Sequence, residues 1–257
     1  MKIGLFIKRE AIEEKFEQEL ISKIKNSGYS FDNDNPDVVL VIGGDGTFLK
    51  AVQKYLGKLD SISFACIKKG KLGFFSGFLF EEIDDLLMNL DKNVYIKNSY
   101  RLLKGKMNNE VIYAVNEIRI ENPFHTLVSE VYINDVFLEK YRGNGLLVST
   151  SLGSTAYNKS LDGAVIDTSL EVMQLNEIAP INNRLYSSLH SPLVVSSTSK
   201  IVFKGDFSSV VIGYDHLVKK DYDSNELEFT LSDKRVTLIR KKEYSHVKRI
   251  NEAFISK

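Results

Sequence analysis

The sequence predicts an α/β N-terminal domain followed by a β-rich C-terminal domain, and three observations lead to this prediction. Apolar runs alternate with amphipathic helical patterns up to about residue 90, which is typical of parallel strands covered by helices. From residue 94 onward, short strand-like segments dominate. The 257 residues suffice for one large or two moderate domains. From the change in pattern we expect domains at 1–98 and 99–240, with a terminal helix, 241–257, returning to the first.

The N-terminal elements follow from local patterns. Ile3 to Ile7 reads as a strand, and an apolar residue recurs every fourth position over 11–27 before Gly28, which predicts an amphipathic helix. Residues 38–42 form an unbroken apolar run that is rich in β-branched side chains, so we expect a strand buried on both faces. A helix to about residue 56, a strand over 62–67 and a helix over 81–90 complete this domain.

The C-terminal part is expected to consist mostly of strands. Strand-like segments lie within 94–121, and residues 127–141 have the pattern of a hairpin with its turn at Asn134-Asp135. Helices are expected over 155–161, 169–178 and 244–255. The remaining strands are expected at 145–149, 192–196, 200–204, 209–214, 226–231 and 235–240.

The composition argues against several classes of function. Lysine plus arginine and aspartate plus glutamate both number 34, and this balance argues against a general nucleic-acid binder. The single cysteine, Cys66, can form neither a disulfide framework nor a cysteine-rich metal site, which fits a reducing cytoplasm. The N-terminus does not resemble a signal peptide, and no apolar segment reaches the length of a membrane span. No histidine belongs to a ligand-spaced pair, so we expect no protein-ligated metal.

The most informative segment is the glycine loop, Gly43-Gly44-Asp45-Gly46-Thr47, between the buried strand and the next helix. The backbone N–H groups of such a loop can approach a phosphate closely. A carboxylate repels phosphate, so Asp45 makes most sense as a group that accepts a proton from, or orients, an attacking hydroxyl. The alternative is a strand-to-helix turn with Asp45 as the N-cap. Three glycines exceed what a turn needs and favour phosphate chemistry.

Further motifs point to a family: Leu72-Gly73-Phe74, Asn116-Glu117 and Ser154-Thr155-Ala156-Tyr157-Asn158. Together with the glycine loop, in this order and spacing, they strongly resemble the bacterial NAD kinases over nearly the whole chain. The glycine loop also occurs in diacylglycerol and sphingosine kinases. The segment 154–158 is what singles out the NAD kinases.

The resemblance implies the two-domain architecture of that family and transfer of the γ-phosphate of ATP to the 2′-hydroxyl of the adenosine ribose of NAD, giving NADP. Asp45 would be the catalytic residue, and Mg²⁺ or another divalent cation would accompany ATP. Polyphosphate as the donor stays open. Family members are commonly homodimers or homotetramers, and we expect the same here. The phosphates would lie against Gly43, Gly44, Gly46 and Thr47.

The resemblance also assigns the NAD site. Asn116 and Glu117 would hold the adenosine, because an amide can pair with adenine and a carboxylate can accept ribose hydroxyls. From the residues alone, an exposed strand end is the simpler interpretation. Thr155, Ala156 and Tyr157 would form a wall for the adenine, and the same segment is compatible with a helix capped by Ser154. The other assigned positions are Phe74, Arg142, Asn144, Ser160, Ala179 and Asp215.

Two positions depart from the family pattern. Asn144 stands where an aspartate usually contacts the nucleotide, so a charge is lost while shape is kept. Ser151-Leu152 replaces a usual proline, so that loop is expected to be less rigid. For Phe75, the sequence does not decide between a position near the NAD site and packing in the core. Arg240 is expected to be solvated.

Two other functions remain as alternatives. A diacylglycerol-type lipid kinase would need an apolar, membrane-facing entrance, and the sequence shows no obvious one. A non-catalytic NAD(P) sensor would keep the pocket without turnover, and the presence of Asp45 argues against it.

Overall fold

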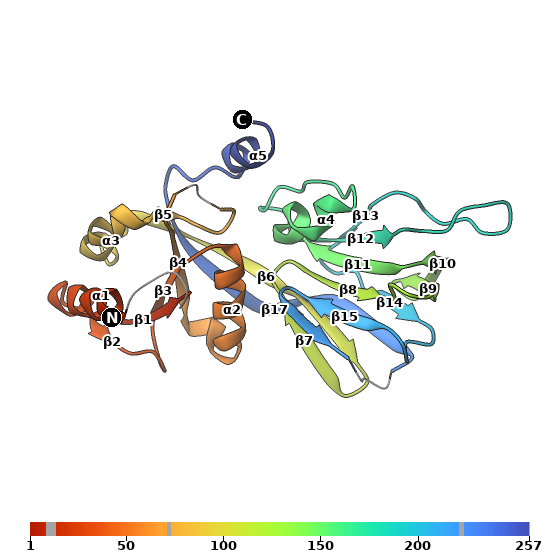
Figure 1. Ribbon diagram of the computed structural model, residues 1–257, viewed down its shortest axis with the longest axis horizontal. Coiled ribbons are helices and arrows are strands. Elements are labelled where there is room, and N and C mark those ends of the chain that lie inside the picture. The colour runs from red at the N-terminus through yellow and green to blue at the C-terminus, as the bar shows by residue number, and fades with distance from the viewer. Residues whose placement is uncertain (9–13, 71–72, 221–223, 257) are drawn as a thin grey trace. The chain divides into compact units, whose positions relative to one another are not determined.

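The computed structural model describes residues 1–8, 14–70, 73–220 and 224–256 (Figure 1). The chain forms two compact units. Unit 1 comprises residues 1–100 and 234–257, and unit 2 comprises residues 101–233. The two unit boundaries fall within the long strands β6 (Tyr95–Met107) and β17 (Glu226–Lys241).

Unit 1 is built on a parallel sheet with the strand order β2-β1-β3-β4. Two further segments pair in parallel with β4, namely β5 and the end of β17. Every residue of β3 is buried, as its unbroken apolar run predicts. The strands are β1 (Lys2–Ile7), β2 (Ser30–Phe31), β3 (Val38–Ile42), β4 (Ser63–Lys68) and β5 (Phe78–Leu79).

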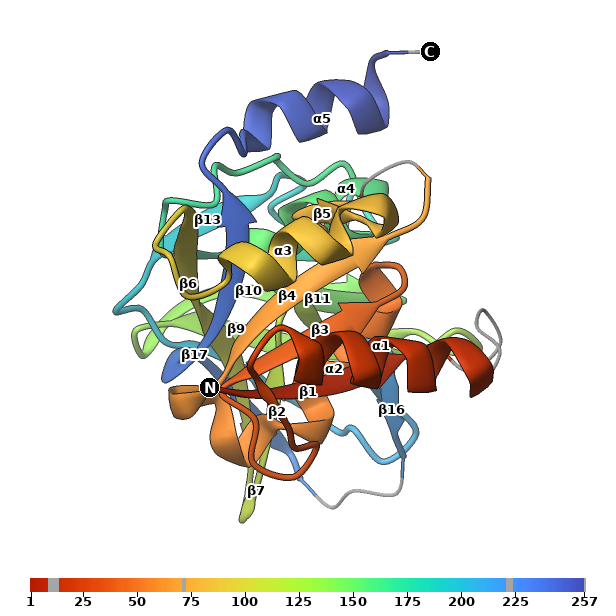
Figure 2. The ribbon, with the colours of Figure 1, turned by 90° about the vertical axis from the view of Figure 1, so that its left-hand side faces the viewer.

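Helices cover both faces of this sheet; in Figure 2, α1 (Glu14–Asn26) and α3 (Ile83–Asn89) lie in front of it and α2 (Asp45–Lys54) behind it. Leu20 of α1 and Leu86 of α3 join one core cluster with Leu40 of β3. On the other face, Phe48 of α2 packs against Phe64 of β4. Residues 11–13, expected to begin the first helix, lie outside the described residues. Short 3₁₀ segments are η2 (Leu56–Ser61) and η3 (Phe80–Glu82), and α5 (His246–Phe254) is the last helix.

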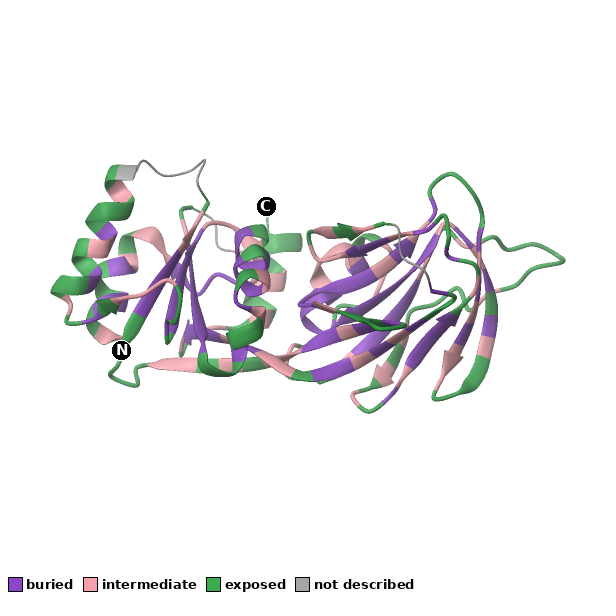
Figure 3. Cartoon of the chain, turned by 90° about the horizontal axis from the view of Figure 1, so that it is seen from below, coloured by how far each residue is buried: buried purple, intermediate pink, exposed green. Residues whose placement is uncertain are grey.

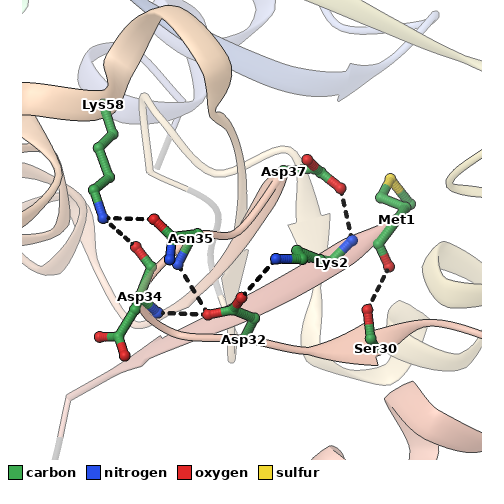
Figure 4. A network of polar contacts seen from close by, with 8 residues as sticks. All are labelled: Met1, Lys2, Ser30, Asp32, Asp34, Asn35, Asp37 and Lys58. Carbon is green, nitrogen blue, oxygen red and sulfur yellow. Dashed lines mark hydrogen bonds and ion pairs between the residues drawn. The ribbon is translucent and has the colours of Figure 1, made fainter.

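A network of polar contacts holds the first residues of the N-terminal strand, β1 (Figure 4). Asp32 accepts hydrogen bonds from the backbone N–H groups of Asp34 and Asn35 and from Nζ of Lys2. These contacts, the hydrogen bond from Asn35 being the largest, lower the pKa of Asp32 to about 2. The network therefore ties β1 to the turn that precedes β3.

Unit 2 consists mainly of two sheets that share one core. The first is the part of a sheet, eleven-stranded within the described residues, that has the order β10-β9-β14-β17, with β6 pairing with β17 and β7 pairing with β6. The second has the order β13-β12-β11-β8-β15-β16. Val131 and Phe229 from the first sheet pack in the same cluster as Ile118 and Leu175 from the second. Figure 3 shows the buried residues concentrated along the strands. None of the helices in the described ranges has the length and apolar content that a membrane crossing requires.

The elements of unit 2 have the following bounds. The strands are β7 (Glu110–Ala114), β8 (Glu117–Glu121), β9 (Leu127–Ile133), β10 (Val136–Gly143), β11 (Gly145–Thr150), β12 (Val172–Ile178), β13 (Leu193–Ser196), β14 (Ile201–Lys204), β15 (Val211–Tyr214) and β16 (Leu217–Lys219). A 3₁₀ segment, η4 (Leu152–Thr155), leads into α4 (Tyr157–Ser160).

The hairpin expected over 127–141 is confirmed by the antiparallel pairing of β9 with β10. Its turn residues, Asn134 and Asp135, both have positive φ, at 51° and 65°. Two consecutive left-handed residues are what a tight turn between twisted strands requires, and asparagine and aspartate tolerate that conformation well.

The helix expected over 169–178 is wrong, because this segment contains β12, paired on both sides with β11 and β13. Its residues favour helices by intrinsic propensity, but tertiary contacts override that preference. Gln174 is fully buried and exchanges two hydrogen bonds with the backbone of Ala164, and Asn176 donates to Asn158. These buried polar side chains hid the alternation of a strand.

The two strands expected at 226–231 and 235–240 are one continuous strand, β17. Residues 232–234, between the two expected strands, are polar. The guanidinium of Arg101 donates to the carbonyl groups of Leu231 and Ser232, at 2.8 and 2.9 Å. With these carbonyls satisfied by a side chain, the strand continues without a turn.

Candidate active site

The glycine loop of unit 1 joins β3 to α2, with Gly44 as the N-cap. Gly43 has a φ of +153°, and a Cβ there would lie 2.4 Å from Oγ1 of the buried Thr47. Apart from the adjacent residues and the backbone of α2, no heavy atom of the described residues lies within 4 Å of the positions that a Cβ would take at Gly44 and Gly46. Among the described residues, Gly44 and Gly46 therefore have space beside their backbone at the start of α2, where the first N–H groups of a helix can bind an anion. The N–H groups of Gly43 and Thr47 already donate, to the carbonyls of Ile67 and Gly44.

The carboxylate of Asp45 is held by two backbone donors. The N–H of Phe74 donates to Oδ2 at 3.1 Å, and the N–H of Phe75 donates to Oδ1 at 3.2 Å. Gly73 permits this approach, since a Cβ there would lie 2.4 Å from Oδ1. The alternative that Asp45 caps α2 is wrong, because Gly44 is the cap and no side chain makes a cap hydrogen bond.

The two phenylalanines of this segment have different surroundings. Phe75 is buried against Phe48, with ring centroids 4.6 Å apart, and so belongs to the core. The ring of the partly buried Phe74 packs against His246 and Phe254 of α5. Leu72, the first residue of the motif, lies outside the described residues.

Arg240 is buried rather than solvated, with 0% of its surface exposed. Its Nη1 donates to the hydroxyl of Tyr100 at 2.6 Å, and its Nη2 donates to the carbonyl of Phe74 at 3.3 Å. The guanidinium stacks on Tyr244, 3.8 Å from the ring centroid. The expectation failed because aromatic rings and a backbone carbonyl replace water around this side chain.

In unit 2, the Asn116-Glu117 motif lies directly against the segment that begins at Gly153. A Cβ on Gly153 would lie 2.0 Å from the carbonyl oxygen of Asn116. Thr150 links the two motifs: its N–H donates to the Asn116 carbonyl, and its Oγ1 accepts the N–H of Gly153. The structure therefore brings together two motifs separated by more than 30 residues in the sequence.

Asp215 holds the backbone of the same motif. Its carboxylate accepts the N–H groups of Val115 and Asn116, at 2.9 and 2.8 Å. Its own N–H donates to the carbonyl of Glu117 at 3.1 Å, and its φ is +48°. This contact is within the chain and gives Asp215 a positioning role at the motif.

Each side chain of the Asn116-Glu117 motif carries a buried oxygen atom that could accept a further hydrogen bond. Oδ1 of Asn116 and Oε2 of Glu117 are buried and have no hydrogen-bond partner among the described residues. Burial, followed by the charge of Asp215, raises the pKa of Glu117 to about 8, while Arg119 acts in the opposite direction. Such atoms are rare inside proteins, and an oxygen of this kind can accept a hydrogen bond from a bound ligand.

Tyr157 is fixed by two charged residues of β8. Its hydroxyl donates to Oε1 of Glu121 at 3.2 Å, and its ring lies 5.2 Å from the Arg119 guanidinium. Arg119 also donates to Glu121 at 2.7 Å, and a Cβ on Gly213 would lie 2.6 Å from its Cζ. Sequence reasoning missed Arg119. The alternation of charges at 117, 119 and 121 would have placed the three side chains on one strand face.

The rest of the 154–160 segment is described by η4 and α4. Ser154 does not cap a helix: its Oγ donates to the Ser151 carbonyl and accepts the N–H of Ile166. Thr155 and Ala156 are partly exposed, and Ser160 is exposed at the end of α4.

Arg142, Asn144 and Ala179 form a separate group, near the other end of β8. The carbonyl of Asn144 accepts the N–H of Asn122, which follows β8. A Cβ on Gly143 would lie 2.7 Å from the carbonyl oxygen of Ala179, whose φ is +47°. The guanidinium of Arg142 lies over the ring of Tyr186, 4.3 Å from its centroid. Tyr157, which reaches Glu121, extends from the first group toward this second one.

Comparisons with known proteins agree with these motifs. Sequence models of the ATP-NAD kinase N-terminal and C-terminal domains match residues 3–95 and 108–241. The NAD kinase of Leuconostoc citreum (strain KM20) is 36% identical over 261 residues, covering 100% of this chain and 98% of that protein. NAD kinase 1 of Listeria monocytogenes serovar 1/2a is 40% identical over 235 residues, or 88% of each chain.

Solved structures show the same fold. Yeast NADH kinase complexed with NADH superposes with a TM-score of 0.83 at 20% identity, covering 100% of this chain and 89% of that one. An NAD kinase from Archaeoglobus fulgidus in complex with ATP gives 0.78 at 22% identity, with 99% and 97% covered. With both domain models matched and relatives this similar over most of its length, the chain belongs to the ATP-NAD kinase family.

Proposed function

We propose that this chain uses ATP to phosphorylate NAD at the 2′-hydroxyl of its adenosine ribose, which yields NADP. Membership of the ATP-NAD kinase family supports the reaction class. The observation that carries the proposal is the carboxylate of Asp45, oriented by two backbone N–H groups beside an open glycine loop. The names of the relatives agree, since they include NAD kinases and an NAD kinase in complex with ATP.

Asp45 is the residue that we assign to the attacking hydroxyl. Each carboxylate oxygen has two lone pairs, and the N–H groups of Phe74 and Phe75 use one on each. The remaining lone pairs can accept the ribose hydroxyl in an orientation set in advance, so that the proton has an acceptor as the oxygen attacks phosphorus. The backbone at Gly43, Gly44 and Gly46, with Thr47, would line the phosphates.

A divalent cation such as Mg²⁺ would neutralise the phosphate charge of the donor. Within the described ranges, no three His, Cys, Asp or Glu side chains come together in a way that could hold a metal ion. We propose that the cation enters with ATP and is held by its phosphates.

For NAD, we assign adenosine recognition to unit 2. The buried Oδ1 of Asn116 can accept the adenine amino group, and Oε2 of Glu117 can accept a ribose hydroxyl. Tyr157, with Thr155 and Ala156, would form the wall beside the adenine. The resemblance further assigns contacts with the dinucleotide to Phe74, Arg142, Asn144, Ser160, Ala179 and Asp215. A homodimer or homotetramer in the cytoplasm belongs to the same proposal.

The first experiment measures NADP formation from NAD, ATP and Mg²⁺, detected through an NADP-specific dehydrogenase, with Asp45→Asn as the control. We expect turnover by the wild type and a loss of about 10²–10⁴-fold in the variant, the usual contribution of general base catalysis. Near-normal turnover in Asp45→Asn would remove Asp45 from this role. Absence of NADP with either ATP or polyphosphate would reject the activity. Diacylglycerol in mixed micelles tests the lipid-kinase alternative.

A further inference from the structure

We propose that Arg240 is a positioning residue that supports the Asp45 carboxylate through one peptide group, the group that joins Phe74 to Phe75. This inference rests on the proposed catalytic function of Asp45. Arg240 lies near the end of β17, almost 200 residues beyond the glycine loop, and no sequence motif singles it out.

The connection runs through opposite ends of the same peptide group. Its carbonyl, which belongs to Phe74, accepts a hydrogen bond from Nη2 of Arg240 at 3.3 Å. Its N–H, which belongs to Phe75, donates to Oδ1 of Asp45 at 3.2 Å. A cation therefore binds one end of the peptide dipole and an anion binds the other. Each interaction polarises the peptide in the direction that strengthens the other.

The burial of Arg240 supports an electrostatic role. A guanidinium is seldom fully buried without a carboxylate partner, because removing the charge from water is strongly unfavourable. The hydrogen-bond acceptors that we find for Arg240 are a tyrosine hydroxyl and a carbonyl, and its Nε is buried with no partner among the described residues. The negative charge of Asp45, which Arg240 reaches through the peptide group, would compensate part of the cost of burying the guanidinium.

The charges of Arg240 and Asp45 both act on the pKa values of the same two residues, Tyr244 and Cys66. Burial raises the pKa of Tyr244, the charge of Arg240 lowers it, and the charge of Asp45 raises it. The same two charges act in opposite directions on the pKa of the buried Cys66 thiol, which burial raises. Arg240 and Asp45 therefore lie in the same part of unit 1, close enough to Tyr244 and Cys66 for both charges to act on them.

This arrangement provides a positive charge that the glycine loop itself lacks. A Walker A loop carries its own lysine, whereas this loop contains an aspartate and no cation. Arg240 supplies positive charge through the Phe74–Phe75 peptide group, and its hydrogen bonds go to a carbonyl and a tyrosine hydroxyl. The outer lone pairs of Asp45 then stay available for the ribose hydroxyl, and its orientation is kept.

The direct test compares variants at Arg240. In Arg240→Gln we expect kcat for NADP formation to fall about tenfold to thirtyfold, less than for loss of a donor that contacts the reacting atoms. We expect KM for NAD to change less than about threefold, because adenosine recognition is assigned to other residues. Arg240→Lys keeps the charge and should recover part of kcat. Tyr100→Phe is the matched control, since it removes the other hydrogen bond of the same guanidinium and should leave kcat within about threefold.

A double-mutant cycle separates this inference from a merely structural role. If Arg240 acts through Asp45, then Arg240→Gln should lower kcat by less than about threefold in the Asp45→Asn background, although it lowers it by at least tenfold in the wild type. Equal fold losses in both backgrounds would overturn the inference. Near-normal activity of Asp45→Asn alone would instead reject the proposed function of Asp45, so the two failures are distinguishable.

A second variant keeps the test valid if Arg240→Gln does not fold. The same cycle can be run with Arg240→Lys, which preserves the charge and the buried volume more closely. Replacing Phe75 by its α-hydroxy analogue turns the peptide group into an ester and removes the N–H that donates to Asp45. The ester protein should lose kcat, and Arg240→Lys should then have little further effect. An undiminished effect of Arg240→Lys in the ester protein would also overturn the inference.

Discussion

The candidate acidic residues of the two units, Asp45 in unit 1 and Glu117 in unit 2, have opposite surroundings. In unit 1, both oxygens of Asp45 accept backbone N–H groups. In unit 2, Oε2 of Glu117 and the nearby Oδ1 of Asn116 are buried without partners among the described residues. The pKa of Glu117 is raised to about 8 by burial and by the charge of Asp215. A group that acts on the substrate is thus oriented in advance, whereas groups that recognise the substrate keep polar atoms free for it.

The difference also concerns energy. A buried polar atom without a partner destabilises the free protein by about 1–3 kcal/mol. A ligand that supplies the missing hydrogen bond removes this penalty, so the penalty becomes part of the binding free energy. Asp45 carries no such penalty, because each of its oxygens already accepts a backbone N–H group. We therefore expect perturbations of unit 1 to change mainly kcat, and perturbations of unit 2 to change mainly KM for NAD.

Gly73→Ala should show the largest effect and should act on kcat. The added Cβ would lie 2.4 Å from Oδ1 of Asp45, so the carboxylate must move away from the Phe74 and Phe75 N–H groups. We expect kcat to fall about 100-fold with KM for NAD nearly unchanged, since small misplacements of a catalytic group have this magnitude. Gly57→Ala is the control, because in the described part of the chain only adjacent residues and its own helical backbone lie near its Cβ position. An equal rise in KM would contradict the division between the units.

Gly153→Ala is the matching change in unit 2. Its Cβ would lie 2.0 Å from the carbonyl oxygen of Asn116, which is backbone and cannot simply rotate away. We expect the unfolding free energy to fall by about 1–3 kcal/mol and KM for NAD to rise at least tenfold. Thermal melts and steady-state kinetics on the same preparation measure both. A variant with unchanged KM but lowered kcat would reverse the assignment.

Sequence patterns predicted those parts of the structure that depend on neighbouring residues. The strand at 38–42 and the hairpin turn at Asn134-Asp135 agree with the structure because apolar runs and turn residues act locally. The helix expected at 169–178 failed because buried side chains such as Gln174 find their partners in another loop. No local pattern reports such a partner.

The same limit applies to the candidate site. The glycine loop and Asp45 stand out because several unusual residues are adjacent. The donors that hold Asp45 are backbone N–H groups about 30 residues away, and backbone groups carry no side-chain signal. Arg240 looked like an ordinary basic residue before a helix, although it is completely buried. Contacts that depend on the tertiary structure were therefore out of reach of the sequence.

Asn116→Ala should weaken NAD binding without affecting the fold. The side-chain Oδ1 has no partner in the described part of the free protein, so its removal leaves nothing unpaired there. We expect the dissociation constant for NAD to rise about tenfold, as is common when one hydrogen bond to a ligand is lost. Isothermal titration calorimetry measures this directly. An unchanged dissociation constant would exclude Asn116 from the NAD site.

Glu117→Gln sharpens the comparison through pH. Because the pKa of Glu117 is raised from 4.5 to about 8 in the folded protein, the folded state keeps a proton that the unfolded chain loses. The wild type should therefore lose stability as pH rises from about 4.5 to 8. Glu117→Gln should lack this loss, with a difference of about 4 kcal/mol at pH 8, because a shift from 4.5 to about 8 is worth 1.36 kcal/mol per pKa unit.

The same variant tests the binding role of the carboxylate. A carboxylate accepts two ribose hydroxyls better than a protonated acid does. NAD binding by the wild type should tighten between pH 6 and pH 8.5, while binding by Glu117→Gln should not depend on pH in this range. Affinities measured at both pH values decide the matter, since parallel profiles for the two proteins would mean that Glu117 does not bind NAD in its charged form.

The smallest effect is expected for Asn144→Asp, which restores the residue that the family usually carries. The amide of Asn144 is already engaged: its Nδ2 donates to the carbonyl of Asn122 at 3.2 Å. An aspartate cannot donate there, and its charge would face that carbonyl, so the variant should be less stable by about 1 kcal/mol. We expect KM for NAD to change less than about threefold, because a new hydrogen bond to the nucleotide would be offset by the lost hydrogen bond to Asn122. A rise in affinity of tenfold or more with unchanged stability would show instead that Asn144 weakens an NAD contact. The second group of residues, around Arg142 and Ala179, would then contribute to recognition as strongly as Asn116 and Glu117.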